Sequence, residues 1–203
     1  MTGLPPTVDP RRVLEEVRWR RDQFLSLLEA LCRQESPSLD PGGQQAVHTV
    51  LAANLDALGF EVRELPGPRS GGHLYARPRR RARDAPLQLL LGHYDTVWPV
   101  GELARQPWRD EDGRLSGPGV YDMKAGLALA ILAVRALQEG RDGLPGRVTF
   151  LVTSDEETGS ESSRRVIEDE ARRSEAVLVL EPSLPAGALK TSRKGCGQYT
   201  VCV

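Results

Sequence analysis

Three runs of apolar residues constrain the fold of this chain more than any other feature. They cover residues 86–91, 147–153 and 176–180, and each leads into a segment rich in polar or turn-forming residues. The second run (RVTFLVT) and the third (AVLVL) are apolar at successive positions rather than at alternate ones. Strands of this kind are typical of sheets whose two faces are both covered. The sequence therefore predicts a sheet buried between layers of helices.

Helical patterns alternate with these strands. Apolar residues at three- and four-residue spacing predict helices over 10–33 and 44–58, and the second helix is expected to end at Gly59. Further helices are predicted over 124–138 and near 160–172, short strands over 60–64 and 72–77, and a loop between the strand at 86–91 and residue 124. The alternation predicts an α/β fold class: a mixed, mostly parallel sheet with helices on both faces.

The composition narrows the range of partners. The formal net charge is −1 over 203 residues, so no overall field attracts nucleic acid or anionic lipid. The basic run PRRRARD at 78–84 is interpreted as a solvated loop, with an anion or nucleic-acid contact as the alternative. No apolar stretch reaches the roughly 18 residues that a membrane span needs, and the N-terminus lacks a signal-peptide core. We expect a cytoplasmic protein without nucleic-acid or membrane partners.

The cysteines and lone histidines give no separate site. Cys32, Cys196 and Cys202 have no spacing typical of metal ligands, and a reducing compartment suits them. His48 falls in a predicted helix and His73 in an early strand, and neither is expected to bind a metal. Catalytic or metal-binding groups must therefore come from other residues.

Candidate catalytic groups follow the predicted strands directly. They occur in the segments GHYDTV, GPGVYDMKAG, TSDEETGS and LVLEPS, and the residues concerned are His93, Asp95, Asp122, Asp155, Glu156, Glu157 and Glu181. In three of these segments, an apolar strand leads straight into the polar group. Ligands of open α/β sheets bind outside the carboxyl ends of the strands, so these side chains are expected to converge there.

Converging carboxylates repel one another unless a positive charge holds them. GHYDT, SDEET and LEPS contain no lysine or arginine, so a bound cation is the simplest counter-charge. One histidine with several carboxylates suits zinc, with cobalt or manganese as substitutes. Asp95 lies two residues after His93 on an extended chain, on the same face, and is expected to hold the second ring nitrogen of the imidazole.

Taken singly, each segment has a simpler interpretation. A histidine after a strand is usually structural, an acidic run is usually a solvated surface, and a Glu-Pro pair usually marks a turn. GPGVYDMKAG is a poor phosphate loop, because it lacks the G-K-[ST] ending. Four such segments in one order favour the metal site over these alternatives.

The order H-x-D, G-x-G-x-x-D-M-K-x-G, D-E-E-x-G-S and E-P-[ST] resembles the di-zinc exopeptidase and deacylase family. That family includes glutamate carboxypeptidase, acetylornithine deacetylase, succinyl-diaminopimelate desuccinylase and aminoacylase. The resemblance extends from ESPSLDPGG near the start to SRKGCGQYTVCV at the end. GHYDTVWPVG and LVLEPS are most similar to the glutamate carboxypeptidase branch.

The resemblance implies a role for each residue of the motifs. Asp122 bridges two zinc ions, His93 and Glu181 complete one of these metal sites, and Glu157 binds the other. Glu156 corresponds to the general base, which takes a proton from the attacking water and passes it to the leaving amine. The family also often has a cis peptide bond after the bridging aspartate, here between Asp122 and Met123.

One part of the family pattern is missing. In the family, the second metal takes a further histidine from far downstream, and a lid domain binds the substrate carboxylate and forms dimers. We therefore expect residues 1–190 to be the N-terminal part of a metallopeptidase catalytic domain. Residues 191–203 are expected to be the hinge and first strand of an absent lid domain, with the strand over 197–203. The chain is interpreted as a fragment, and a degenerate remnant is the alternative.

The resemblance implies a zinc-dependent carboxypeptidase that releases a C-terminal amino acid, such as glutamate, from a small peptide. An N-acyl amino acid deacylase with the same machinery is the nearest alternative, and a non-catalytic metal-binding relative is the third. Glu156 argues against the third, because a purely structural site has no use for a base. The 203 residues alone are expected to be inactive or nearly so.

Overall fold

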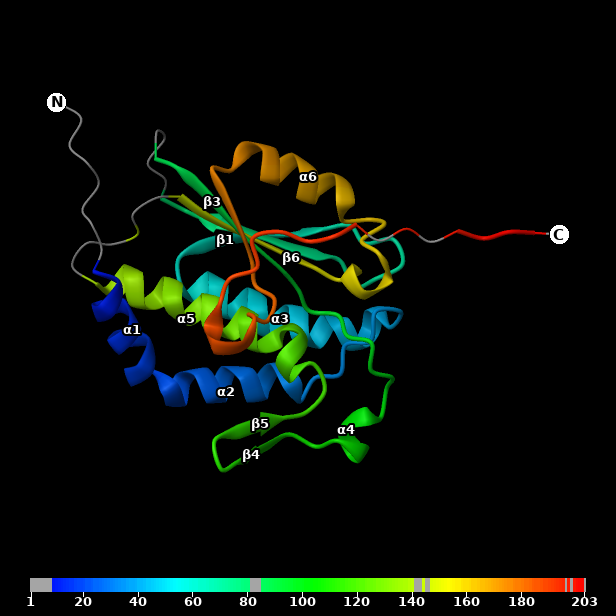
Figure 1. Ribbon diagram of the computed structural model, residues 1–203, viewed down its shortest axis with the longest axis horizontal. Coiled ribbons are helices and arrows are strands. Elements are labelled where there is room, and N and C mark those ends of the chain that lie inside the picture. Colours follow the sequence, from blue (N-terminus) through cyan, green and yellow to red (C-terminus); the bar gives the residue numbers. More distant parts are fainter. Residues whose placement is uncertain are drawn as a thin grey trace.

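A computed structural model describes residues 9–80, 85–140, 144, 147–195, 197 and 199–202. Within these residues, five strands form one sheet in the order β1-β2-β6-β3-β7 (Figure 1). The strands are β1 (Phe60–Leu65), β2 (His73–Pro78), β3 (Leu87–His93), β6 (Arg147–Thr153) and β7 (Ala176–Val179). β3 pairs in parallel with both β6 and β7, whereas β2 is antiparallel to β1 and β6. The predicted mixed, mostly parallel sheet is confirmed.

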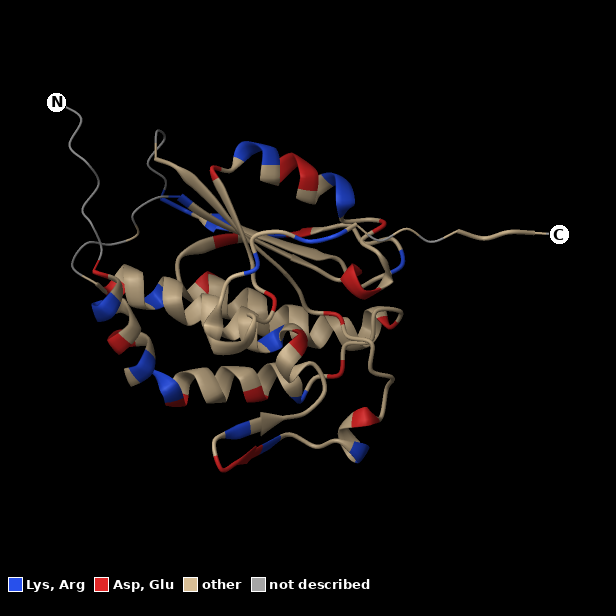
Figure 2. Ribbon diagram, viewed as in Figure 1, with Lys and Arg blue, Asp and Glu red and all other residues tan. Residues whose placement is uncertain are grey.

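Helices cover both faces of this sheet (Figure 1). One side carries α3 (Pro41–Ala57) and α5 (Ala125–Glu139), which contact the strands, while α1 (Pro10–Trp19) and α2 (Arg21–Cys32) pack against α5. The other side carries α6 (Arg164–Arg173), which is rich in charged residues (Figure 2). This arrangement confirms the predicted α/β class.

The hydrophobic core lies between the sheet and the layer of α3 and α5. Leu51 and Leu55 of α3 are fully buried, and Phe60 packs edge-on against Phe150 with ring centroids 5.5 Å apart. In β6, every residue after Arg147 is buried. Burying one such large apolar side chain stabilises a fold by about 1.5–3 kcal/mol, so this layer supplies much of the stability.

The single helix predicted over 10–33 is wrong, because the chain turns at Arg20 between α1 and α2. The guanidinium of Arg20 is buried and donates hydrogen bonds to Glu16 and to Glu139 at the end of α5. The turn lets α1 and α2 each pack against α5, which one straight helix could not do. A helical periodicity does not reveal such a change of direction, because both halves keep the same spacing.

The predicted loop before residue 124 contains more structure than expected. It includes α4 (Glu102–Arg105), a hairpin of β4 (Arg109–Glu111) and β5 (Arg114–Ser116), and an irregular turn over Val120–Lys124 in which Asp122 and Met123 are not helical. The hairpin turns at Asp112 and Gly113, which both have positive φ angles, as tight hairpin turns require. These elements are too short to show a clear hydrophobic period.

Two further predictions need correction. The helix expected near 160–172 begins only at Arg164, because residues 162 and 163 direct their backbone N–H groups to Asp155. The strand expected over 197–203 is wrong for the described residues there, 197 and 199–202, which form no strand. A strand needs a neighbouring strand to pair its backbone groups. The last part of the basic run, residues 81–84, lies outside the described residues.

Candidate metal centre

The carboxyl ends of three parallel strands meet at one edge of the sheet. His93 is the last residue of β3 and is in register with Thr153, the last residue of β6. Glu156 and Glu157 follow β6 in a 3₁₀ turn (Glu156–Thr158), and Glu181 lies two residues after β7. Because β3 lies between β6 and β7, the carboxylates in the segments after these two strands approach His93 from both sides.

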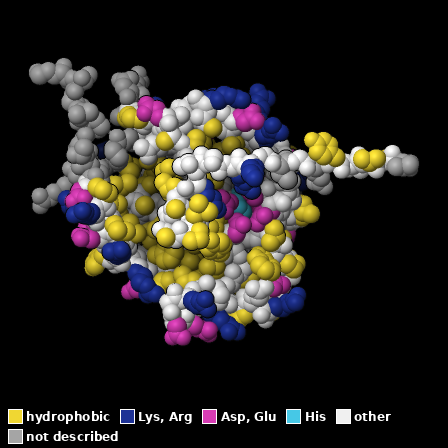
Figure 3. Space-filling model, in the orientation of Figure 1, with side chains coloured by type: hydrophobic (Ala, Val, Ile, Leu, Met, Phe, Trp, Pro, Cys, Tyr) yellow, Lys and Arg dark blue, Asp and Glu magenta, His cyan; other side chains and the backbone are white. Residues whose placement is uncertain are grey.

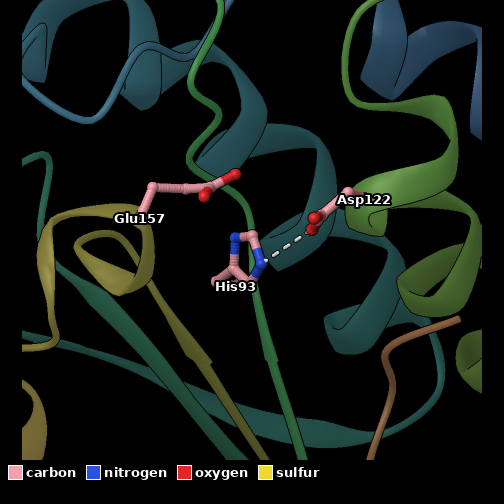
Figure 4. A group of neighbouring side chains, drawn as sticks. All are labelled: His93, Asp122 and Glu157. Carbon is pink, nitrogen blue, oxygen red and sulfur yellow. Dashed lines mark ion pairs between the residues drawn. The ribbon is translucent and has the colours of Figure 1, made fainter. Parts of the chain in front are cut away.

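The structure brings the predicted ligands together around the imidazole of His93. Its Nε2 atom lies 3.1 Å from Asp122 Oδ1, 3.1 Å from Glu181 Oε1 and 3.7 Å from Glu156 Oε2. Ligand atoms of His93, Asp122 and Glu157 all lie within 4.8 Å of one another. Figure 4 shows these three side chains, with the contact between His93 and Asp122 dashed. Acidic side chains surround a histidine on the molecular surface in Figure 3.

Asp122 reaches this cluster from the turn that precedes α5. The peptide bond between Asp122 and Met123 is cis, which confirms the predicted cis bond. Met123 is buried against Gly92, where an added Cβ would lie 2.9 Å from Met123 Cε. The backbone N–H of His93 contacts Met123 Sδ at 3.2 Å. The small residue before His93 thus lets the turn with Asp122 approach the end of β3.

Asp95 links the histidine to the turn after β6. Its Oδ1 lies 3.3 Å from His93 Nδ1, and its backbone oxygen lies 3.0 Å from the same nitrogen. The carboxylate also accepts hydrogen bonds from the backbone N–H groups of Glu156 (3.3 Å) and Glu157 (3.2 Å), and from the hydroxyl of Ser38 (2.7 Å). Sequence spacing indicates only the contact with His93, because the other partners are about 60 residues away along the chain.

The charges within the cluster shift the pKa values of its own side chains. Burial alone would lower the pKa of His93, but hydrogen bonds to Asp95 and Glu181, together with the charges of Asp95 and Glu156, raise it to about 11. Burial raises the pKa of Glu156 and of Glu157, and neighbouring carboxylates raise both further. In the part of the chain that the structure describes, no arginine or lysine forms an ion pair with Asp122, Glu156, Glu157 or Glu181.

This donor set fits a divalent metal such as zinc. Zinc binds imidazole nitrogen and carboxylate oxygen, and both kinds of atom converge here. A dication would also supply the positive charge that the carboxylates lack, in place of the proton on His93. The residues present can therefore hold a metal without rearrangement of the fold.

The two remaining histidines lie outside this group. His48 on α3 packs edge-on against the ring of Tyr94, with ring centroids 6.3 Å apart. His73 on β2 is hydrogen-bonded to Ser154 and Ser162. Burial lowers the pKa of both histidines, so each is a neutral, buried imidazole near neutral pH. Among the described residues, neither belongs to a group that could hold a metal.

Comparison with known proteins identifies the family of this chain. Residues 89–194 match the model of the family described as peptidase family M20/M25/M40. The chain is 34% identical over 161 residues to carboxypeptidase G2 of Pseudomonas sp. (strain RS-16), covering 78% of this chain and 38% of that protein. It is 37% identical over 196 residues to succinyl-diaminopimelate desuccinylase of Leptothrix cholodnii, covering 87% of this chain and 50% of that protein. The chain belongs to peptidase family M20/M25/M40, which confirms the resemblance predicted from its motifs.

Solved structures agree in fold. Human carnosine dipeptidase 1 matches with a TM-score of 0.67 at 22% identity, covering 86% of this chain and 41% of that one. The M20 family metallo-carboxypeptidase Sso-CP2 from Sulfolobus solfataricus matches with a TM-score of 0.65 at 22% identity, covering 82% and 39%. In these comparisons the chain spans half or less of each relative's length. Among the described residues, no helix is long and apolar enough to cross a membrane.

Proposed function

We propose that this chain carries the metal-binding core of a metal-dependent amide hydrolase, most closely a carboxypeptidase that releases a C-terminal amino acid from a small peptide. The observation that carries the proposal is the convergence of His93, Asp122 and Glu157, with ligand atoms within 4.8 Å of one another. Glu181 and Glu156 approach the same imidazole nitrogen. Membership of family M20/M25/M40 supports hydrolysis as the reaction.

In this proposal, Asp122 would help to hold both of two zinc ions, for which cobalt or manganese could substitute. His93 and Glu181, in contact at 3.1 Å, would complete one metal site. Glu157 would contribute to the other from the turn after β6, on the side of β3 opposite β7. Bound zinc would polarise the scissile carbonyl and stabilise the charge that develops on its oxygen. The protein residues would fix where that carbonyl lies.

Glu156 is the proposed general base. Its carboxylate is about half exposed and lies 3.7 Å from His93 Nε2, so it borders the cluster and remains open to water and substrate. Burial and the neighbouring carboxylates raise its pKa toward the neutral range, where a base is most effective. Glu156 would take a proton from the attacking water and deliver it to the nitrogen of the leaving amine.

Asp95 is proposed to orient these groups rather than to react. It is fully buried, and its carboxylate contacts His93 Nδ1 together with the backbone of Glu156 and Glu157. It would therefore direct Nε2 of the imidazole toward the metal and keep the base at a constant distance from it. Outer partners of this kind commonly raise metal affinity by about 10–100-fold.

An N-acyl amino acid deacylase is the second candidate. The 37% identity to a succinyl-diaminopimelate desuccinylase favours it, just as the 34% identity to carboxypeptidase G2 favours the carboxypeptidase. Both reactions break an amide bond beside an amino acid carboxylate, so the same five residues would serve either. A panel of dipeptides and N-acyl amino acids separates the two by their relative kcat/KM values.

We further propose that residues 1–190 are the N-terminal part of the catalytic domain and that residues 191–203 lead into a lid domain through which the whole protein dimerises. The length of the relatives supports this division, because the chain spans 38% and 50% of the two compared above. The second metal would have only Asp122 and Glu157 from this chain. The 203-residue chain is therefore expected to bind one metal tightly and to hydrolyse substrates poorly.

The variant Glu156→Gln tests the proposed reaction. In a full-length protein that carries this sequence, we expect loss of hydrolysis by about 10²–10⁴-fold, because the amide cannot accept the proton. Zinc affinity of the 203-residue chain should stay within about twofold, since Glu156 is not a proposed ligand. Glu157→Gln is the matched control, and it should weaken metal binding. Near-normal turnover by Glu156→Gln with full zinc occupancy would contradict the assignment of the base.

A further inference from the structure

The turn that carries Glu156 and Glu157 is held by side chains from other elements as well as by its own hydrogen bonds. Its own regular structure is a single 3₁₀ turn of three residues. Ser154 follows β6 directly and leads into this turn. It is contacted by side chains from α3, from the loop before β2 and from β2 itself. Gln44 Nε2 donates to the backbone oxygen of Ser154 at 3.0 Å, and the hydroxyls of Ser70 and Ser154 lie 2.7 Å apart. The third contact comes from His73.

His73 bridges the two ends of this turn. Its ring is 1% exposed, and its Nδ1 accepts a hydrogen bond from the backbone N–H of Ser154 at 3.3 Å. Because Nδ1 accepts, the proton of the neutral ring resides on Nε2. That nitrogen lies 3.1 Å from the hydroxyl oxygen of Ser162 and donates to it. The two ring nitrogens thus contact residues eight positions apart, on either side of Glu156 and Glu157.

Asp155 closes the same turn. The hydroxyl of Ser162 donates to Asp155 Oδ2 at 2.6 Å, and the backbone N–H groups of Ser162 and Ser163 donate to the same oxygen at 2.8 and 3.2 Å. Asp155 is 6% exposed, so these bonds are shielded from water. A continuous chain of hydrogen bonds therefore runs from His73 through Ser162 to the residue that precedes Glu156.

We propose that His73 is a positioning residue for the metal centre: through Ser162 and Asp155, it fixes the turn that presents Glu156 and Glu157 to His93. The inference rests on the proposed metal centre. Ligand atoms must meet a metal within about 0.2 Å of their preferred distances, so displacement of the turn would weaken binding even when the fold is intact. The tightly held turn is the reason that Glu157 and Asp122 can share a metal.

Zinc titration of the 203-residue chain by calorimetry tests this role. In this chain, the second zinc is the one that depends on Glu157. His73→Phe keeps an aromatic ring and removes both hydrogen bonds, and it should weaken binding of that second zinc about tenfold. His73→Gln keeps an amide donor that reaches Ser162, and it should restore the affinity to within about threefold of the original. Ser162→Ala removes only the hydroxyl of an exposed residue, and it should weaken the affinity about threefold.

His48→Phe is the matched control, because it also replaces a buried histidine but one that lies outside this chain of hydrogen bonds. Its zinc affinity should change by less than about twofold, and circular dichroism should show all variants folded at the titration temperature. If His73→Phe and Ser162→Ala bind zinc as His48→Phe does, the positioning role is wrong and the metal centre stands. If the original chain binds zinc no better than Asp122→Asn does, the metal centre and the positioning role both fail, because Asp122 belongs to both proposed metal sites.

Discussion

Strands β6 and β7 are both apolar and both pair in parallel with β3, yet their surroundings differ. β6 has a strand on each side, and six of its seven residues are buried. β7 is the edge strand, and Val177, Leu178 and Val179 are 37%, 51% and 57% exposed. The same kind of sequence thus gives a central strand in one place and an exposed strand in the other.

The two strands also support their functional groups differently. The turn after β6 forms hydrogen bonds with α3, with the loop before β2, with β2 and with Asp95. Glu181 after β7 contacts the imidazole of His93, and its side chain is 30% exposed. We infer that the β6 side of the site is organised by the fold, whereas the β7 side becomes rigid when Glu181 binds a metal.

The largest expected difference between the two strands is in stability. Phe150→Ala in β6 should lower the free energy of unfolding by about 3–5 kcal/mol, because it opens a cavity in the core. Leu178→Ala in β7 should lower it by less than about 1 kcal/mol, since half of that side chain is already exposed to water. Urea unfolding of both variants checks the comparison. Equal losses would mean that β7 is covered in solution.

A smaller effect is expected in backbone hydrogen exchange with and without zinc. If Glu181 is a ligand, the local opening of β7 that permits exchange must release the metal. Exchange of the β7 amides should therefore slow about 100-fold at a zinc concentration about 100 times Kd. Glu181→Gln should remove this protection, while zinc still binds through the other residues. Unchanged exchange of β7 in the presence of bound zinc would exclude Glu181 as a ligand.

The smallest effect concerns the pH dependence of metal binding. In the metal-free chain the pKa of His93 is raised to about 11, so near neutral pH the imidazole is protonated and zinc must displace that proton. Zinc affinity should therefore rise about tenfold per pH unit between about pH 6 and pH 8, with release of about one proton. Calorimetry in buffers of different ionisation enthalpy measures this proton. A flat affinity above pH 7 would show that His93 has an ordinary pKa.

Much of the site could be predicted from the sequence because its residues follow buried strands. The prediction of a strand over 147–153 agrees with β6 at both ends, since a continuous apolar run needs cover on both faces. Parallel strands end at a common edge, so the segments after β3, β6 and β7 were expected to meet. The cis bond at Asp122 and the family itself followed from the resemblance of the motifs.

Other features depend on contacts between distant parts of the chain. The break at Arg20 follows from packing against α5 and a contact with Glu139, which no local periodicity records. The strand predicted over 197–203 failed for the described residues there, because alternation of side chains does not provide a pairing partner.

For this protein, the sequence by itself determined the alternation of strands and helices and the family, and it predicts the ligand residues, because hydrophobic period and residue type are local properties. The tertiary structure alone decided that β3 lies between β6 and β7, and that Asp95 and His73 hold the turn with Glu156 and Glu157. Hydrogen bonds between residues about 60 to 90 positions apart form only when the whole sheet is assembled. We therefore expect the strength of the proposed metal site to depend also on His73 and Ser162, which its motifs do not contain.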